Sequence, residues 1–457
     1  MAEQQQGPFY VGVDVGTTSV KVCAFDGDGA MVAETIKAYE LLHPEPKSAV
    51  QLPSDIIEAC NAALRQTVRK CPGPVAAIGL SCPMHSVVLY HEEEGFADTI
   101  YTWADGRGED VIHHFGKDLR RELHRLTGTP VHPMSPLVKF RWLRENYPEQ
   151  IAAATHLYSL KELLVNFWAT ETALDEQLAS ATGLYDAVAG EWCDLALRTA
   201  AGQTAEEYER EGFTLQLPPV RPATYRLEWR PETARWLGVQ GIPLFLGGSD
   251  GCLANLGSGI TGPGEVAVTI GTSAAVRATH PRGRIDPAHQ LFNYQIDAER
   301  FAVGGASNNG GKIVEYWQEL LRAHFVDIPA FIDAAFTQDE DDSLCFQPYL
   351  YGERAPLWDA AATAALTGLR GHHTPAQIAR AVLDGVTDNV VAILRALEAA
   401  TGPTKTIHAS GGFTRSPEWM ALLAEKSGRE VVMAKTPQAS AYGAALVARR
   451  GLEDSET

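Results

Sequence analysis

The chain has 457 residues, and 57 acidic against 38 basic side chains give it a formal net charge of −19. Its hydrophobic share of 45% and charged share of 21% are typical of a globular protein of two or three domains, which excludes a disordered, collagen-like or coiled-coil chain. The acidic balance disfavours nucleic acid and anionic membranes as partners, although small anionic ligands respond to local donors instead.

Seven cysteines are scattered along the chain without a Cys-x-x-Cys pair. That pattern disfavours a disulfide framework or a structural zinc site and suits a reducing compartment. The first residues lack the basic and apolar regions of a signal peptide, and no apolar run approaches the ~18 residues that would cross a bilayer. We therefore expect a cytoplasmic protein.

The first third of the chain predicts a hairpin and then alternating strands and helices. Residues 9–15 are apolar and predict a buried strand, and extended runs lie on either side of the turn at 26–29. Further strands are expected over 30–36, 75–81 and 86–90. Helices are expected over 54–70, 107–126, 135–146 and 161–168.

The second half begins, like the first, with an apolar strand followed by a glycine turn. An apolar strand over 264–270 runs into Gly271-Thr272-Ser273, as the first strand runs into Gly16-Thr17-Thr18-Ser19. Two matches at corresponding points suggest an internal duplication of a phosphate-handling hairpin, with two unrelated hairpins as the alternative.

Alternating elements then complete the second half and predict an α/β fold. The boundary between two domains is expected after a polar, proline-rich stretch, between residues 246 and 247. A strand is expected over 274–279, helices over 374–400, 416–427 and 438–449, and strands over 405–409 and 430–433.

The two glycine turns are candidate phosphate sites. Glycine lets the backbone approach a phosphate closely, and successive amides and hydroxyls form an anion-binding concavity. Asp14, at the end of the first strand, is suited to hold a hydrated Mg²⁺ through water. Ordinary hairpin turns are the alternative. The candidate phosphate-binding residues are Gly16, Thr17, Thr18, Ser19, Lys21, Gly271, Thr272 and Ser273.

A third glycine motif follows the strand expected over 405–409. Gly411 and Gly412 leave a flat backbone surface on which an adenine ring could lie, and Phe413 completes the motif. These three residues are the candidate adenosine site. An unliganded strand-to-helix loop is the alternative.

Asp250 is the candidate general base. It lies among glycines at a strand end, a position that suits an unobstructed carboxylate. The same segment matches the G-x-S-x-G pattern, with Ser249 as a hydrolase nucleophile. No oxyanion loop of the His-Gly-Gly type precedes it, and the one suitable downstream histidine, His408, is inside an expected strand, so we favour the base.

Trp103, Asp105 and Arg107 are spaced by two residues. In an extended segment all three would point to one face and offer an apolar plate, a hydroxyl acceptor and a forked donor, which is what a polyol site needs. Met84 and His85 are expected to line the same pocket. A surface salt bridge beside a core tryptophan is the alternative.

Together these motifs resemble those of the FGGY carbohydrate kinases, in the superfamily of actin, hexokinase and the chaperone ATPases. The resemblance implies two actin-like ATPase (ribonuclease H-like) domains with an interdomain cleft. Residues 1–246 would form the sugar-binding domain and residues 247–457 the nucleotide-binding domain. Segments most similar to the gluconate kinases of this family lie at 81–86, 103–105, 127–136, 179–185 and 351–359.

By that resemblance we expect ATP and Mg²⁺ as cofactors and Asp250 as the catalytic base. The acceptor would be D-gluconate, phosphorylated on its terminal hydroxyl to 6-phospho-D-gluconate. The candidate substrate-binding residues are Met84, His85, Trp103, Asp105, Arg107 and Asp250. Because gluconate is an anion, its carboxylate needs a donor, and the candidates are Arg107, His85, His132 and Lys161.

Two alternatives stay open. A xylulose kinase or another ketose or polyol kinase of the same family is the near one, and a non-catalytic nucleotide switch of the actin or chaperone kind is the remote one. The expected partner is a small sugar or sugar acid, with no nucleic acid and no membrane. Formation of a homodimer is left open.

Overall fold

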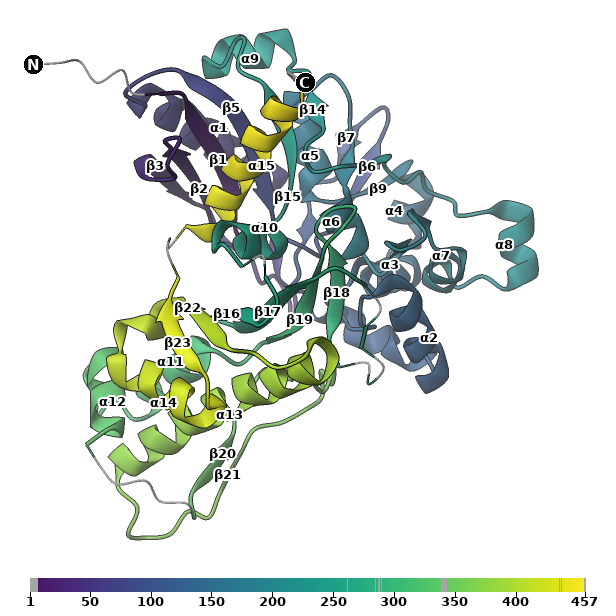
Figure 1. Ribbon diagram of the computed structural model, residues 1–457. Helices are drawn as coiled ribbons and strands as arrows, with labels where there is room; N and C mark the ends of the chain where they lie inside the picture. Colours follow the sequence, from purple (N-terminus) through teal and green to yellow (C-terminus); the bar gives the residue numbers. More distant parts are fainter. Residues whose placement is uncertain are drawn as a thin grey trace, which may run out of the picture.

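The computed structural model describes residues 7–455 except 261, 284, 287, 289, 338–342, 435 and 437. Two six-stranded sheets organise the chain into two lobes, one above the other in Figure 1. No helix among the described residues is long and apolar enough to cross a membrane.

The first sheet has the strand order β14-β15-β5-β1-β2-β3. Its central strand β1 (Phe9–Val15) pairs antiparallel with β2 (Ser19–Phe25) and parallel with β5 (Val75–Cys82). The remaining strands are β3 (Met31–Ala38), β14 (Arg226–Leu227) and β15 (Leu244–Ser249). The predicted domain boundary after residue 246 falls inside β15, whose residues all belong to this sheet.

The second sheet has the order β18-β19-β17-β16-β22-β23. Here β16 (Glu265–Ile270) pairs antiparallel with β17 (Ala274–His280) and parallel with β22 (Thr406–Ser410). The same arrangement surrounds β1, so the two glycine turns occupy equivalent places in the two lobes. The remaining strands are β18 (Phe292–Gln295), β19 (Phe301–Ser307) and β23 (Glu430–Met433).

Two helices cover opposite faces of the first sheet. Val11 and Val13 on β1 lie in the core that α1 (Pro53–Lys70) closes, whereas Gly12 between them faces α15 (Ala439–Ser455). Alternate residues of a strand point to opposite faces, which explains this division. The C-terminal helix thus returns to the first lobe, where Figure 1 shows it in yellow among the purple strands, and α10 (Asp250–Gly257) packs against it.

In the second lobe the long helix α13 (Pro375–Thr401) packs on β17 and β19. Three further helices pack against α13: α11 (Gly311–Leu320), α12 (Ile328–Ala335) and α14 (Pro417–Ser427). The short elements of this lobe are β20 (Cys345–Gln347), β21 (Ala365–Thr367) and the 3₁₀ helix η2 (Gly412–Arg415).

Residues between β5 and β15, together with Val50 from the segment before β5, build a separate hydrophobic core beside the first sheet. The elements that contribute to this region and its surroundings include η1 (Arg107–His114), α2 (Lys117–Thr127), α3 (Pro136–Asn146), α4 (Pro148–Ala153), α5 (Leu160–Trp168), α6 (Glu176–Ser180), α7 (Asp194–Ala201), α8 (Ala205–Glu211) and α9 (Pro231–Leu237). Its short strands are β4 (Val50–Gln51), β6 (Val88–His91), β7 (Gly95–Phe96), β8 (Ile100–Tyr101), β9 (His156–Tyr158), β10 (Leu174–Asp175), β11 (Tyr185–Asp186), β12 (Glu191–Trp192) and β13 (Val220–Arg221).

The predicted helix over 107–126 is wrong as a single element. The chain forms the 3₁₀ helix η1, breaks at Phe115 and Gly116, and starts α2 at Lys117. Gly116 is the N-cap of α2, and glycine is a poor residue for the interior of a helix. The other predicted strands and helices match observed ones, most of them within two residues at each end.

Candidate active site

Two acidic residues lie at the same edge of the first sheet. Asp14 is the penultimate residue of strand β1, and Asp250 follows β15 directly as the first residue of α10. Since β1, β5 and β15 are parallel neighbours, their carboxyl ends meet at one edge, where α/β sheets bind ligands. Ser81 on the intervening β5 donates a hydrogen bond to the Asp14 carboxylate (2.7 Å).

The carbonyl groups of the first glycine turn (residues 16–19) accept hydrogen bonds from neighbouring side chains. The Tyr39 hydroxyl donates to the Gly16 carbonyl (2.6 Å), and the Gln51 amide donates to that of Thr17 (2.7 Å). The Trp103 indole N–H donates to the Thr17 hydroxyl (2.9 Å). With these acceptors occupied, the turn is rigid. The neighbouring Thr18 is exposed.

The second glycine turn is anchored by a helix. Its carbonyls accept hydrogen bonds from the first backbone amides of α11. The Gly311 amide donates to the Gly271 carbonyl (2.6 Å), and the Lys312 amide donates to the Thr272 carbonyl (3.2 Å). Within the turn, the Gly271 amide donates to the Ser273 carbonyl (2.9 Å), as Gly16 donates to Ser19 (2.9 Å) in the first. The two turns are therefore held in similar ways.

A small cavity of about 210 Å³ brings the two turns and the acidic edge together. Thr17, Ser273 and Asp250 all line it. So do three of the predicted substrate residues, Met84, His85 and Trp103. A recess of this size holds several waters and has room for a small polyol.

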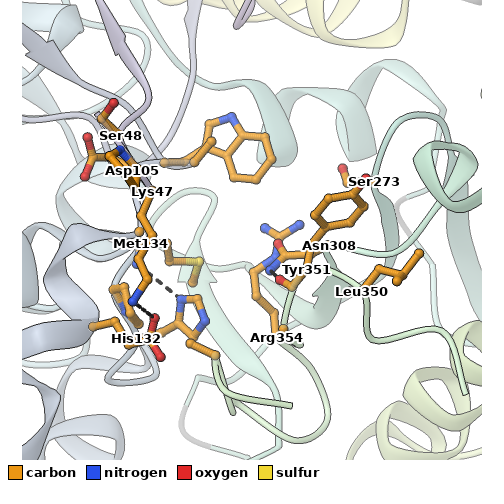
Figure 2. A pocket seen from close by; sticks show the side chains of 18 of the residues that line it. Lys47, Ser48, Asp105, His132, Met134, Ser273, Asn308, Leu350, Tyr351 and Arg354 are labelled. Carbon is orange, nitrogen blue, oxygen red and sulfur yellow. Dashed lines mark hydrogen bonds and ion pairs between the residues drawn. The ribbon is translucent and has the colours of Figure 1, made fainter. Parts of the chain in front are cut away.

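A larger cleft of about 990 Å³ adjoins the small cavity and shares four lining residues with it: Trp103, Met134, Ser273 and Arg354. Figure 2 shows its two walls, with Lys47, Asp105 and His132 on one side and Asn308, Tyr351 and Arg354 on the other. The small cavity is thus a recess beside a wide cleft between the lobes.

Asp250 has the surroundings of a base. It is half-buried, and its Oδ1 accepts a hydrogen bond from the Gly251 amide (2.7 Å). Burial raises its pKa above the ordinary range, and the positive charge of Arg277 opposes that rise. A carboxylate with a raised pKa that is still ionised accepts a proton more readily near neutral pH.

The hydrolase alternative does not fit the position of Ser249. Its side chain is fully buried and accepts a hydrogen bond from the Cys252 amide as the N-cap of α10. A nucleophilic serine at such a turn must be exposed to its substrate. Ser249 therefore acts as the N-cap of α10.

The expectation of an extended segment over 103–107 is wrong. Asp105 lies in a turn, and Arg107 opens the 3₁₀ helix η1. The Arg107 guanidinium forms an ion pair with the Asp105 carboxylate, with a shortest contact of 2.6 Å, and a second ion pair with Glu45. It also lies over the Trp142 ring. Arg107 lines neither cavity, and Asp105 lines only the larger cleft.

The other basic candidates carry no free positive charge. Lys161 is fully buried against Asp175 (3.2 Å). Burial lowers the pKa of His85 to about 3, with the Lys139 charge adding to the effect, so His85 is neutral. Its Nδ1–H donates to the Ala181 carbonyl (2.8 Å). Burial likewise lowers the pKa of His132 well below its ordinary value.

Sequence reasoning missed two arginines in the small cavity. Arg277 comes from β17 and Arg354 from the loop between β20 and β21. Strand alternation could have found Arg277, because it shares a face with Ser273 and Ala275. No periodic signal marks Arg354, since its segment is a loop.

The predicted adenosine motif adjoins the second glycine turn. A Cβ on Gly411 would lie 2.4 Å from the Ile270 carbonyl, and its φ of 99° also requires glycine. At Gly412 a Cβ would meet nothing within 4 Å, so the backbone there is open. Phe413 instead packs in the core against the ring of Trp419, which makes it a support for this loop.

Asp14 is the residue whose surroundings fit a hydrated metal. Among the described residues no three His, Cys, Asp or Glu side chains cluster as a complete metal cage. Mg²⁺ suits such a site, because it keeps several waters and uses one or two carboxylates together with substrate phosphates. Burial raises the pKa of Asp14 to about 6, and a nearby cation would favour its ionised form.

Comparisons with known proteins agree with these motifs. The N-terminal domain of the FGGY family of carbohydrate kinases matches residues 9–257, and the C-terminal domain of that family matches residues 266–452. A gluconokinase of Bacillus subtilis is 32% identical over 454 residues, which cover 96% of this chain and 86% of that protein.

Two solved structures from Lactobacillus acidophilus superpose over nearly the whole chain. A ligand-bound xylulose kinase has a TM-score of 0.90 at 29% identity, covering 99% of this chain and 91% of that one. A gluconate kinase has a TM-score of 0.88 at 28% identity, covering 98% and 90%. The chain belongs to the FGGY family of carbohydrate kinases, and it is a sugar kinase with the actin-like ATPase fold.

Proposed function

We propose that the protein transfers the γ-phosphate of ATP to the terminal hydroxyl of D-gluconate, giving 6-phospho-D-gluconate. The observation that carries the proposal is the small cavity that Thr17, Ser273 and Asp250 line together. It lets a substrate hydroxyl approach a carboxylate and two phosphate turns at once. The likeness to the Bacillus subtilis gluconokinase supports gluconate as the acceptor.

In this mechanism the Asp250 carboxylate accepts the proton of the terminal hydroxyl while that oxygen attacks the γ-phosphorus. Amides and hydroxyls of residues 16–19 and 271–273 would donate to the phosphate oxygens, and Lys21, opposite Asp14 on β2, adds positive charge. Such transfer depends mainly on positioning and charge stabilisation. Mg²⁺, held by Asp14 through water, would neutralise further phosphate charge when bound.

The adenosine would lie on the open backbone at Gly412, while Gly411 packs closely against the end of β16 beside the second turn. Phe413 would support this surface from below. The predicted contact of Asp105 and Arg107 with the sugar is not part of the mechanism, because each already binds the other.

A ketose kinase is the competing function, favoured by the likeness to a ligand-bound xylulose kinase. Met84, His85 and Trp103 would suit a ketose as well as a sugar acid. The deciding measurement is phosphorylation of gluconate, xylulose, ribulose and glycerol under the same conditions. Activity on xylulose with none on gluconate would overturn our choice. ATP hydrolysis that no acceptor stimulates would instead support a nucleotide switch.

Replacement of the base tests the role of Asp250. Asp250→Asn keeps the shape but cannot accept the proton, and we expect kcat to fall by about 10²- to 10⁴-fold. Binding of gluconate, measured by calorimetry, should change far less. The melting temperature serves as the folding control. A folded variant with wild-type turnover would remove Asp250 from the base role.

A further inference from the structure

Positive charge in the small cavity exceeds negative charge. Its charged lining residues are Asp250, Arg277 and Arg354, with His85 held neutral. Neither arginine forms an ion pair with a carboxylate of the described residues, and the buried Nε atoms of both have no hydrogen-bond partner there. In a chain of net charge −19, this recess is an exception that suits an anionic ligand.

The two arginines lie beside different residues of the cavity: Arg277 is near Asp250, and Arg354 is near Trp103. A Cβ on Gly251 would lie 3.3 Å from the Arg277 Nε, so Arg277 borders the base Asp250. The Arg354 guanidinium lies over the Trp103 ring, 5.0 Å from its centre, and its charge acts on His85 and His132. Arg354 also lines the larger cleft, where Figure 2 shows it facing the wall that carries His132 and Met134.

Arg354 is held firmly in place. Its residue is 7% exposed, and its Nη2 donates to the Ser307 carbonyl (3.0 Å). The adjacent Glu353 is fully buried and accepts hydrogen bonds from Ser307 (2.7 Å) and Asn389 (2.7 Å), which fixes the loop. Burial lowers the pKa of Arg354 to about 10, so the guanidinium stays protonated at neutral pH.

We propose that Arg354 binds the carboxylate of the acceptor and thereby selects a sugar acid over a neutral sugar or polyol. This inference rests on the proposed function. The terminal hydroxyl must reach Asp250, and in an aldonic acid the carboxylate is at the other end of the carbon chain. Arg277 borders the base, which leaves Arg354 for the carboxylate.

The energetics favour an anion at this place. A buried guanidinium without an opposite charge is costly, and a bound carboxylate removes that cost through charge-assisted hydrogen bonds. A neutral acceptor of the same length leaves the guanidinium without an ion pair, with only the charge of the adjacent Glu353 to offset its burial in part. The site therefore discriminates by rejecting neutral ligands as well as by attracting acids.

D-Gluconate and D-glucitol form a matched ligand pair for the test, because they differ by a carboxylate in place of a hydroxymethyl group. For Arg354→Met we expect gluconate affinity, measured by calorimetry without ATP, to fall by about 30-fold or more. The affinity for glucitol should change less than about threefold. Arg354→Lys keeps the charge and should recover part of the loss. Arg322→Met, which removes an exposed arginine outside both cavities, is the charge control.

The outcomes separate the two proposals. Equal weakening of gluconate and glucitol, or a rise in KM for ATP alone, would show a structural or phosphate role and overturn the assignment of Arg354. Gluconate affinity retained by a folded Arg354→Met would overturn it too, while the proposed function stood. A wild-type protein that phosphorylates xylulose or glucitol but not gluconate would refute the proposed function before any variant is made.

Discussion

Buried charges in the first lobe are neutralised in different ways. Lys161 and Asp175 compensate each other, as do Arg107 and Asp105. Glu176, at the start of α6, instead accepts a hydrogen bond from the Ala223 amide (3.2 Å). A buried carboxyl in such surroundings keeps its proton at a higher pH than an exposed one. Burial raises the pKa of Glu176 to about 8.

This raised pKa predicts a loss of stability with rising pH. The folded state keeps the Glu176 proton up to about pH 8, whereas the unfolded state releases it near the ordinary pKa of 4.5, so the unfolded state binds fewer protons between these values. Glu176→Gln removes this term. In urea unfolding we expect the variant to match the wild type near pH 5 and to exceed it by about 2–4 kcal/mol near pH 9.

The matched control is Glu209→Gln on the exposed surface of α8. Its difference from the wild type should stay the same at both pH values. A Glu176→Gln variant whose difference from the wild type is also independent of pH would contradict the prediction.

At the residue scale, sequence reasoning singled out residues at strand ends, and the structure brings Thr17 and Asp250 together in one cavity. Asp14, Thr17 and Asp250 belong to short motifs that begin where an apolar strand stops. The pairing of Arg107 with Asp105 corresponds to the salt bridge that the sequence offered as the alternative, whereas the pairing of Lys161 with Asp175 depends on how the chain folds back between them. Arg354 lies in a loop, and the role proposed for it depends on its forming no ion pair with a carboxylate of the described residues, which only the folded chain reveals.

At the scale of elements, α15 lies unusually close to two strands of the first sheet. A Cβ on Gly12 of β1 would lie 1.8 Å from the Ala441 carbonyl, and one on Gly79 of β5 would lie 2.2 Å from that of Ala444. These distances are far inside van der Waals contact. Glycine in the strands and alanine in the helix are what allow the two layers to meet.

Gly12→Ala tests this contact. The added methyl group must push the backbone of α15 away, and we expect a loss of about 3 kcal/mol in the free energy of unfolding, measured by urea denaturation. Gly27→Ala is the control, because a Cβ there meets nothing within 4 Å. An equal effect of the two substitutions would show that α15 does not require the close approach.

Elements with a clear pattern were predictable, and others were not. The hairpins around both glycine turns and the long helix α13 follow from apolar runs and N-caps. The strands β18 and β19 and the helices α11 and α12 went unrecognised: the two strands are buried on both faces and show no alternation, and the two helices are only 10 and 8 residues long. The break between η1 and α2 depends on one glycine inside an otherwise helical stretch.

At the scale of the whole molecule, a chain of strongly negative net charge contains a small cavity that we propose binds an anion. A net charge of −19 gives no long-range attraction for an anionic ligand such as ATP or the proposed acceptor gluconate, so their capture would depend on a few local donors. Salt shortens the range of the repulsion, to a Debye length of about 8 Å at ~0.15 M. We therefore expect kcat/KM for gluconate to rise modestly, by less than about twofold, between ~0.05 and ~0.3 M salt. A steep fall would contradict this and indicate a basic funnel.

The two-lobe architecture was predictable from the repeated turns and the family resemblance. What the sequence did not reveal is that the two lobes are not consecutive halves. The predicted second unit began at residue 247 and ran to the end of the chain, yet β15 and α15 both belong to the first lobe. Nothing in the sequence of α15 indicates that it packs against the first sheet rather than the second.

The return of α15 makes the second lobe an insertion within the first. Residues from β16 to β23 are continuous in the chain, whereas the first lobe needs α15, which follows them, to cover one face of its sheet. During translation the face of the first sheet around Gly12 and Gly79 therefore stays uncovered until 17 C-terminal helical residues arrive. A chain that stopped before α15 would therefore carry the strands of both sheets but leave this face of the first sheet without its covering helix.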